Sequence, residues 1–232
     1  MKQHKAQCFL CSPYSSSFHS KIEKEILRNE FTKDSTWGFK MLSRRSSYFQ
    51  AVYVEKLIYT EKTVDPFGVD TEIERVSYDQ IEFQVNIYKP NILIFQPPRN
   101  YRKLINQLAQ FVDYAIAIET KDIKVFDWID LLVANGINGI VTKINVDQIC
   151  YDKATTGKLT LISVNDVRER FHQILQKTNY FVKNAKISFD EKVNLPEVEI
   201  FSNGKIVFKS PVAVENFKPF YDAFFEVTER QQ

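Results

Sequence analysis

A pattern of strand-forming and helix-forming residues occurs twice in this chain, at an offset of 67 or 68 residues. The segment Tyr78–Phe83 precedes an apolar run at 91–95, and the segment Val146–Tyr151 precedes a similar run at 158–162. Each run leads into a stretch with helical spacing of apolar residues. The main evidence for a repeat is the spacing of apolar residues, which changes from strand-like to helix-like in the same order in both copies. The chain is therefore expected to contain a duplicated β-β-α-β unit.

Apolar runs, alternating segments and amphipathic stretches define the remaining elements. Turn residues in Asp65–Gly68 join two long arms of an expected antiparallel hairpin, and Asn203-Gly204 is the strongest hairpin signal. Strands are predicted near 5–11, 48–62, 71–86, 92–95, 114–119, 139–151, 158–162, 185–190, 197–201 and 206–208, and helices near 18–27, 99–111, 126–133, 165–177 and 213–229. The simplest fold that buries every apolar stripe is α+β, a mostly antiparallel sheet with helices on one face.

Three consecutive regions are expected within one continuous structure. They are a strand, helix and basic hairpin region at 1–70, a first β-β-α-β unit at 71–135, and a second such unit with a C-terminal hairpin and helix at 136–232. The order of sheet and helix, with Asn203-Gly204-Lys205-Ile206 joining the last hairpin, is similar in outline to the duplicated saddle of TATA-binding-type domains. This resemblance covers part of the chain and assigns no role to any residue.

Composition narrows the class of protein. A chain of 232 residues with 44% apolar residues can bury a core without disulfide or metal staples, so no cofactor is expected. The longest apolar stretch, Tyr114 to Ile118, is far shorter than the roughly 20 residues that a membrane helix needs. Three cysteines, an odd number, fit a reducing compartment. We therefore expect a cytoplasmic protein with no membrane partner.

Basic residues gather in two places. Residues 1 to 62 carry 11 Lys or Arg against 6 Asp or Glu, and aromatic residues lie among the cations near 37–49. The stretch 96–103 places two prolines and three cations at a predicted helix start, where an anion could bind. Solvated cations on an ordinary hairpin, and prolines that merely end a strand, are the favoured alternatives. The candidate residues for nucleic-acid or anion binding are Lys40, Arg44, Arg45, Arg99, Arg102 and Lys103.

Two further groups of residues have types and spacings that could suit a catalytic or metal site. The ligand types and spacing of His4, Cys8, Cys11 and His19 would suit zinc, but buried free thiols are the favoured interpretation. Glu119 and Lys121 end an apolar strand in the manner of metal-dependent nucleases, with Asp113 at the other end of that strand. An exposed ion pair is the favoured alternative there.

The sequence therefore predicts a non-catalytic binding or adaptor subunit of a macromolecular complex, with a protein partner. Two alternatives stay open at this point. One is a DNA- or RNA-binding protein that uses the basic residues, and the other is a metal-dependent nuclease that uses Glu119 and Lys121.

Overall fold

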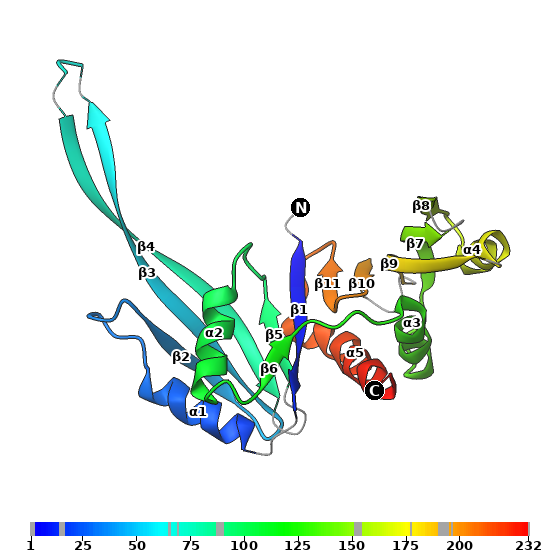
Figure 1. The fold of residues 1–232 in the computed structure, drawn as a ribbon, viewed down its shortest axis with the longest axis horizontal. Helices are drawn as coiled ribbons and strands as arrows, with labels where there is room; N and C mark the ends of the chain where they lie inside the picture. Colours follow the sequence, from blue (N-terminus) through cyan, green and yellow to red (C-terminus); the bar gives the residue numbers. More distant parts are fainter. Residues whose placement is uncertain are drawn as a thin grey trace. The chain divides into compact units, whose positions relative to one another are not determined.

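The computed structural model describes residues 3–13, 17–64, 66–68, 70–86, 91–150, 155–176, 178–189, 195 and 197–231 (Figure 1). The chain divides into two compact units. The central unit comprises Cys11–Ile118, and the C-terminal unit combines Met1–Leu10 with Glu119–Gln232. The chain passes between the units within two strands, β1 (His4–Ser12) and β6 (Ala117–Glu119).

The central unit is built on an antiparallel sheet in the order β2-β3-β4-β5. β3 and β4 pair along their whole length, from Tyr48 opposite Asn86 to Val64 opposite Asp70. The predicted long hairpin is thus confirmed, although Asp65 of its turn lies outside the described residues. The elements of this unit are α1 (Phe18–Arg28), β2 (Trp37–Arg44), β3 (Tyr48–Val64), β4 (Asp70–Asn86), β5 (Asn91–Phe95) and α2 (Arg102–Phe111).

Aromatic side chains form much of the core of the central unit. Phe39, Tyr53 and Ile81 are direct cross-strand partners, so they lie on one face of the sheet. The ring centroid of Phe39 lies 5.5 Å from that of Phe111, at the end of α2. Helix α2 therefore packs on the face that carries Phe39, where it buries Leu108 as its sequence predicts.

In the C-terminal unit, antiparallel sheet strands follow one another in the order β1-β11-β10-β9-β7-β8. Its remaining elements are α3 (Val125–Ala134), β7 (Ile140–Cys150), β8 (Thr156–Ile162), α4 (Arg168–Leu175), β9 (Asn179–Ser188), β10 (Val198–Phe201), β11 (Lys205–Phe208), the 3-10 helix η2 (Val214–Phe217) and α5 (Lys218–Arg230). Tyr151, Lys177 and Asp190, which end three of the predicted elements, lie outside the described residues.

Helices α3 and α5 pack together beside this sheet. The Trp128 indole, fully buried, donates a hydrogen bond of 2.9 Å to the Phe220 carbonyl, and its ring lies 5.0 Å from Phe224. The Phe220 ring meets Phe208 of β11 edge-on at 5.3 Å. A fully buried row of cross-strand partners runs through the sheet and consists of Ile144, Ala185, Ile200 and Ile206. Apolar residues thus hold the sheet and α5 together.

The structure confirms the expected fold class as a mixed α/β protein with extensive antiparallel sheet. The order strand, strand, helix, strand is present in both 70–119 and 140–188. The equivalence of these segments as a duplicated unit, and the placement of the helices on one face, stay predictions. None of the described helices is both long enough and apolar enough to span a bilayer.

Two expectations about local structure are wrong. The strand predicted from Tyr114 to Glu119 is only Ala117–Glu119, because Asp113 and Tyr114 adopt left-handed backbone angles, each with a φ of 55°, where α2 ends. The apolar stripes expected on two helices also include exposed residues: Val133 is 38% exposed and Ile174 is 47% exposed. The neighbouring Ile129 and Leu175 carry the packing instead.

Candidate partner-binding arm

The outer part of the β3–β4 hairpin is the most exposed regular structure of the central unit. Figure 1 shows β3 and β4 continuing as a two-stranded ribbon past the ends of β2 and β5. Every described residue from Ile58 to Val76 is exposed to solvent. We call this segment the arm. At about 3.3 Å per residue, each of its strands extends for about 20 Å.

Apolar side chains lie on both faces of the arm. Ile58 and Val76 are direct cross-strand partners, 56% and 47% exposed, and Tyr78 lies diagonally beside Ile58 on the same face. On the opposite face, Tyr59 and Ile73 are diagonal neighbours. Both faces therefore present apolar surface to solvent. In an ordinary antiparallel sheet, the apolar face is packed on a core and the solvent-facing side is polar.

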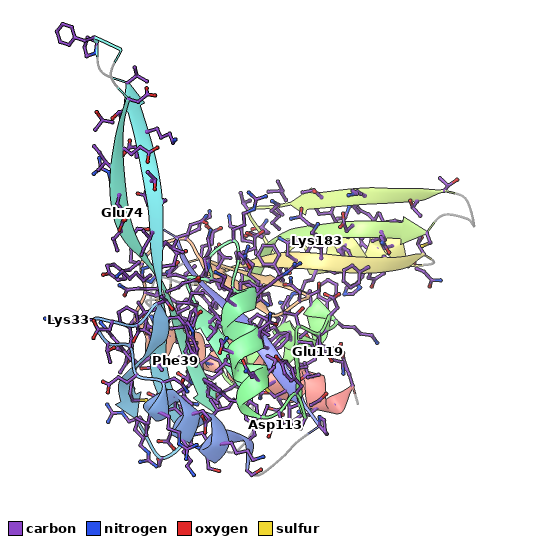
Figure 2. The ribbon with its side chains drawn as sticks, turned by 60° about the vertical axis from the view of Figure 1, so that its left-hand side comes forward. Lys33, Phe39, Glu74, Asp113, Glu119 and Lys183 are labelled. Atoms are coloured by element: carbon purple, nitrogen blue, oxygen red, sulfur yellow. The ribbon has the colours of Figure 1, made fainter. Side chains whose placement is uncertain are left out.

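Cross-strand ion pairs hold the arm in register. Lys62 Nζ lies 2.6 Å from Glu72 Oε1, and Arg75 Nε lies 2.9 Å from Glu61 Oε2. Figure 2 shows Glu74 on this ribbon, well away from Phe39 in the core of the same unit. Exposed ion pairs contribute little stability, and a lone hairpin is marginally stable in water. These contacts therefore favour one register of the arm but add little to its free energy of folding.

The charge of the arm is negative. Between Ile58 and Val76 the sequence has five acidic residues and two basic ones. This balance disfavours phosphate backbones and leaves exposed apolar side chains as the main source of binding free energy. The arm can therefore bind a protein surface through apolar contacts and through the unpaired outer edges of its two strands.

The predicted basic residues of β2 do not form one surface. Lys40 is opposite Val52, and Arg44 is opposite Phe49, so the two cations lie on opposite faces of the sheet. Lys40 lies 5.6 Å from the centroid of the Phe31 ring. The remaining residue of this group, Arg45, is exposed.

The Arg44 guanidinium is engaged within the central unit. Arg44 Nε lies 2.8 Å from Glu23 Oε1 on α1, and Glu23 is only 8% exposed. A carboxylate that has lost most of its water needs such a partner. The contact gives Arg44 a structural role in attaching α1 to β2.

One cation of the basic cluster at the start of α2 is paired with a carboxylate of the sheet. Arg99 and Arg102 are exposed, whereas Lys103 forms an ion pair with Glu55 of β3. The Asn100 side-chain oxygen accepts a hydrogen bond of 3.1 Å from the Arg102 backbone N–H. This backbone N–H, which the expected anion site would use, is therefore already hydrogen-bonded within the protein.

Acidic and aromatic groups complete the surroundings of Lys103. A pocket of about 200 Å³ is lined by Lys103, Glu55 and Asp79 together with Tyr53. Burial, with a further contribution from the Glu55 carboxylate, raises the pKa of Tyr53 to about 12. Both effects disfavour additional negative charge, so this pocket is poorly suited to phosphate.

The candidate zinc ligands each have other surroundings. His4 Nδ1 lies 3.0 Å from the Val212 carbonyl oxygen. Cys8 and Cys11 are buried free thiols, and burial raises the pKa of each well above its usual value. His19 lies on α1 beside Glu23. Within the described part of the chain, no group of three or more His, Cys, Asp or Glu residues could hold a metal ion.

The candidate nuclease residues lie at the end of β6. Glu119 is the last residue of this three-residue strand and is exposed, and Lys121 follows it in an irregular segment. The third residue considered, Asp113, belongs to the turn after α2 and not to the strand. The strand on which the nuclease hypothesis depended is therefore shorter than expected.

The sequence contained a signal for the arm that its composition obscured. The sequence predicts the length of the hairpin, but the β-branched residues of its outer part, such as Ile58 and Val76, are of a type common in half-buried strands. The usable signal is that β2 and β5, the neighbours of the hairpin, are too short to cover 17-residue strands.

No protein-family model matches the chain, and no curated protein sequence matches it.

Proposed function

We propose that this protein is a non-catalytic adaptor subunit that binds a protein partner through the β3–β4 arm. The observation that carries the proposal is the exposure of apolar side chains on both faces of a hairpin extending beyond its sheet. Contiguous exposed apolar surface on an ordered element is typical of interaction sites.

The chemistry of the arm favours a protein partner. Ile58 and Val76 with Tyr78 provide one apolar patch, and Tyr59 with Ile73 provides another on the opposite face. A partner that encloses the ribbon would bury both patches, whereas one that adds a strand to its edge would use backbone hydrogen bonds. In either case the acidic side chains at the rim favour a partner surface with basic residues.

Removal of the arm tests the proposal. Leu57 and Ser77 are direct cross-strand partners, so residues 58–76 can be replaced by Asn-Gly, which closes a two-residue hairpin between opposed strands. The shortened protein should keep its thermal unfolding midpoint, because the described residues among those removed are all exposed. It should lose the protein that co-purifies with the tagged wild type from the native host.

Two double variants test whether binding needs the apolar side chains or only the presence of the ribbon. Ile58→Ser with Val76→Ser should greatly reduce co-purification of the partner. Thr60→Ser with Glu74→Asp, a cross-strand pair on the same face whose charge is kept, should retain it. Equal recovery of the partner by wild-type and shortened protein would refute the proposal.

A further inference from the structure

The C-terminal unit contains a groove of about 660 Å³ that the proposed function of the arm does not use. Its walls are the first turn of α3, the start of β9, His172 of α4 and Gln231, which follows α5. Sites for small ligands have volumes of roughly 300–1,000 Å³. The groove is therefore large enough to hold a small organic molecule.

Aromatic rings line this groove from three elements. Phe126 belongs to α3, His172 to α4, and Tyr180 to β9. The centroids of Phe126 and His172 are 5.4 Å apart, with their planes at 40°. The lining also includes Phe181.

A buried ring fixes the orientation of this lining. Phe171 has no exposed surface and lies 5.1 Å from Phe126 at an interplanar angle of 56°. It also lies 5.1 Å from Tyr180 at 87°. Because one immobile ring supports two lining rings at different angles, the walls of the groove are built before any ligand arrives.

The charge of the lining is negative. Asp122, Asp127 and Lys124 contribute a formal charge of −1 when His172 is neutral. Ser202 Oγ donates a hydrogen bond of 2.8 Å to Asp122 Oδ1, and Gln231 Nε2 donates one of 3.1 Å to Asp127 Oδ2. These neutral donors orient the two carboxylates and leave their charge in place.

We propose that the groove binds a small organic ammonium ion, with alkyl groups on the nitrogen. The faces of aromatic rings attract a cation, and alkyl groups on the nitrogen add apolar contacts with the same rings. Asp122 and Asp127 supply further attraction. Asp127 also occupies the first turn of α3, so its charge opposes the preference of a helix N-terminus for anions.

Paired titrations test whether charge or shape determines binding. Choline and 3,3-dimethylbutan-1-ol have nearly the same shape, but only choline is charged. Titration of the full chain, followed by NMR, should show saturable binding of choline that is at least about fivefold tighter than that of the alcohol. Equal affinities would show an ordinary apolar groove and overturn the proposal, as would the absence of saturable choline binding.

Two variants locate the binding. Phe126→Leu keeps apolar volume but removes a ring, and should weaken choline binding by roughly 2- to 30-fold. Asp127→Asn keeps an acceptor for Gln231 and should weaken it by a smaller factor. Tyr59→Leu on the arm is the matched control and should leave the affinity unchanged. Wild-type affinity in both groove variants would overturn the proposal, and none of these results bears on the partner of the arm.

Discussion

A half-buried histidine and a buried carboxylate meet where α1 packs on the central sheet. The His19 ring lies 5.0 Å from the ring of Phe49, and His19 Nδ1 lies 3.9 Å from Glu23 Oε2. The other ring nitrogen of His19 has no hydrogen-bond partner among the described residues. Burial lowers the pKa of His19, and Arg44 lowers it further against the opposing effect of Glu23.

This lowered pKa predicts that stability falls in mild acid. The unfolded chain takes up a proton at His19 near its ordinary pKa of about 6.5, before the folded protein does. The stability that neutral His19 contributes is therefore fully present above that pH, and it is lost as the pH falls toward the folded-state pKa. Urea unfolding at several pH values between about 7.5 and 5 should show a smaller loss for His19→Gln than for wild type. Parallel losses would contradict the assignment.

Single residues also report on the packing of the helices. Leu108 of α2 and Leu175 of α4 are 0% and 4% exposed. Leu108→Ala and Leu175→Ala should each lower the free energy of unfolding by roughly 2–5 kcal/mol, because each leaves a cavity. Ile174→Ala, at the exposed neighbouring position, should cost far less. Denaturant melts measure all three variants. A loss under about 0.5 kcal/mol at Leu108 or Leu175 would place that residue at the surface.

At the scale of elements, two turns with glycine in the left-handed region differ in their surroundings. Gly204 has a φ of 80°, and a Cβ there would lie 2.6 Å from the Phe224 ring. Gly68, at the tip of the arm, has a φ of 83° with nothing within 4 Å of such a Cβ. Only the first turn therefore adds a steric clash to the backbone strain.

This difference predicts unequal effects of one substitution. Gly68→Ala should cost about 1 kcal/mol of unfolding free energy at most, since strain in an exposed hairpin tip can relax by fraying. Gly204→Ala should cost about 2 kcal/mol or more, because Phe224 must also move. Thermal or urea unfolding of the two variants provides the comparison. Equal costs would mean that the β10–β11 turn does not pack on α5.

The sequence predicted elements better than their surroundings. Asn203-Gly204 was sufficient to place the last hairpin, because turn chemistry is a local property. The expected wet face of β4 is wrong at Gln84, which is only 2% exposed. Exposure of Ile174 and of the whole arm depends on which neighbours cover them. Neighbours are a tertiary property, so the apolar identity of Ile174 alone wrongly suggested that it is buried.

For the whole molecule, the basic residues were less informative than their number suggested. Lys40 and Arg44 lie on opposite faces of the sheet, and both Arg44 and Lys103 form ion pairs with glutamates. Charge counts do not show which cations are already paired. The aromatic lining of the groove in the C-terminal unit was equally hidden, because Phe126, His172 and Tyr180 are far apart in sequence.

A salt titration tests the nucleic-acid alternative. If Arg99 and Arg102 contact phosphates, the double variant Arg99→Ala/Arg102→Ala should reduce the log–log salt slope by roughly 0.7–0.9 for each lost contact. The adaptor function predicts weak binding of DNA and RNA with an unchanged slope, since the arm is acidic. A reduced slope would bring the nucleic-acid function forward.

The affinity of the isolated partner for the arm tests the central claim most directly. After the co-purifying protein is identified, titration calorimetry can compare wild type with Ile58→Ser/Val76→Ser and with the control Thr60→Ser/Glu74→Asp, which keeps the charge of the arm. The account predicts at least about a tenfold loss of affinity for the first variant and little change for the control, because buried apolar anchors dominate interfaces. Equal affinities for all three proteins would show that the partner binds elsewhere.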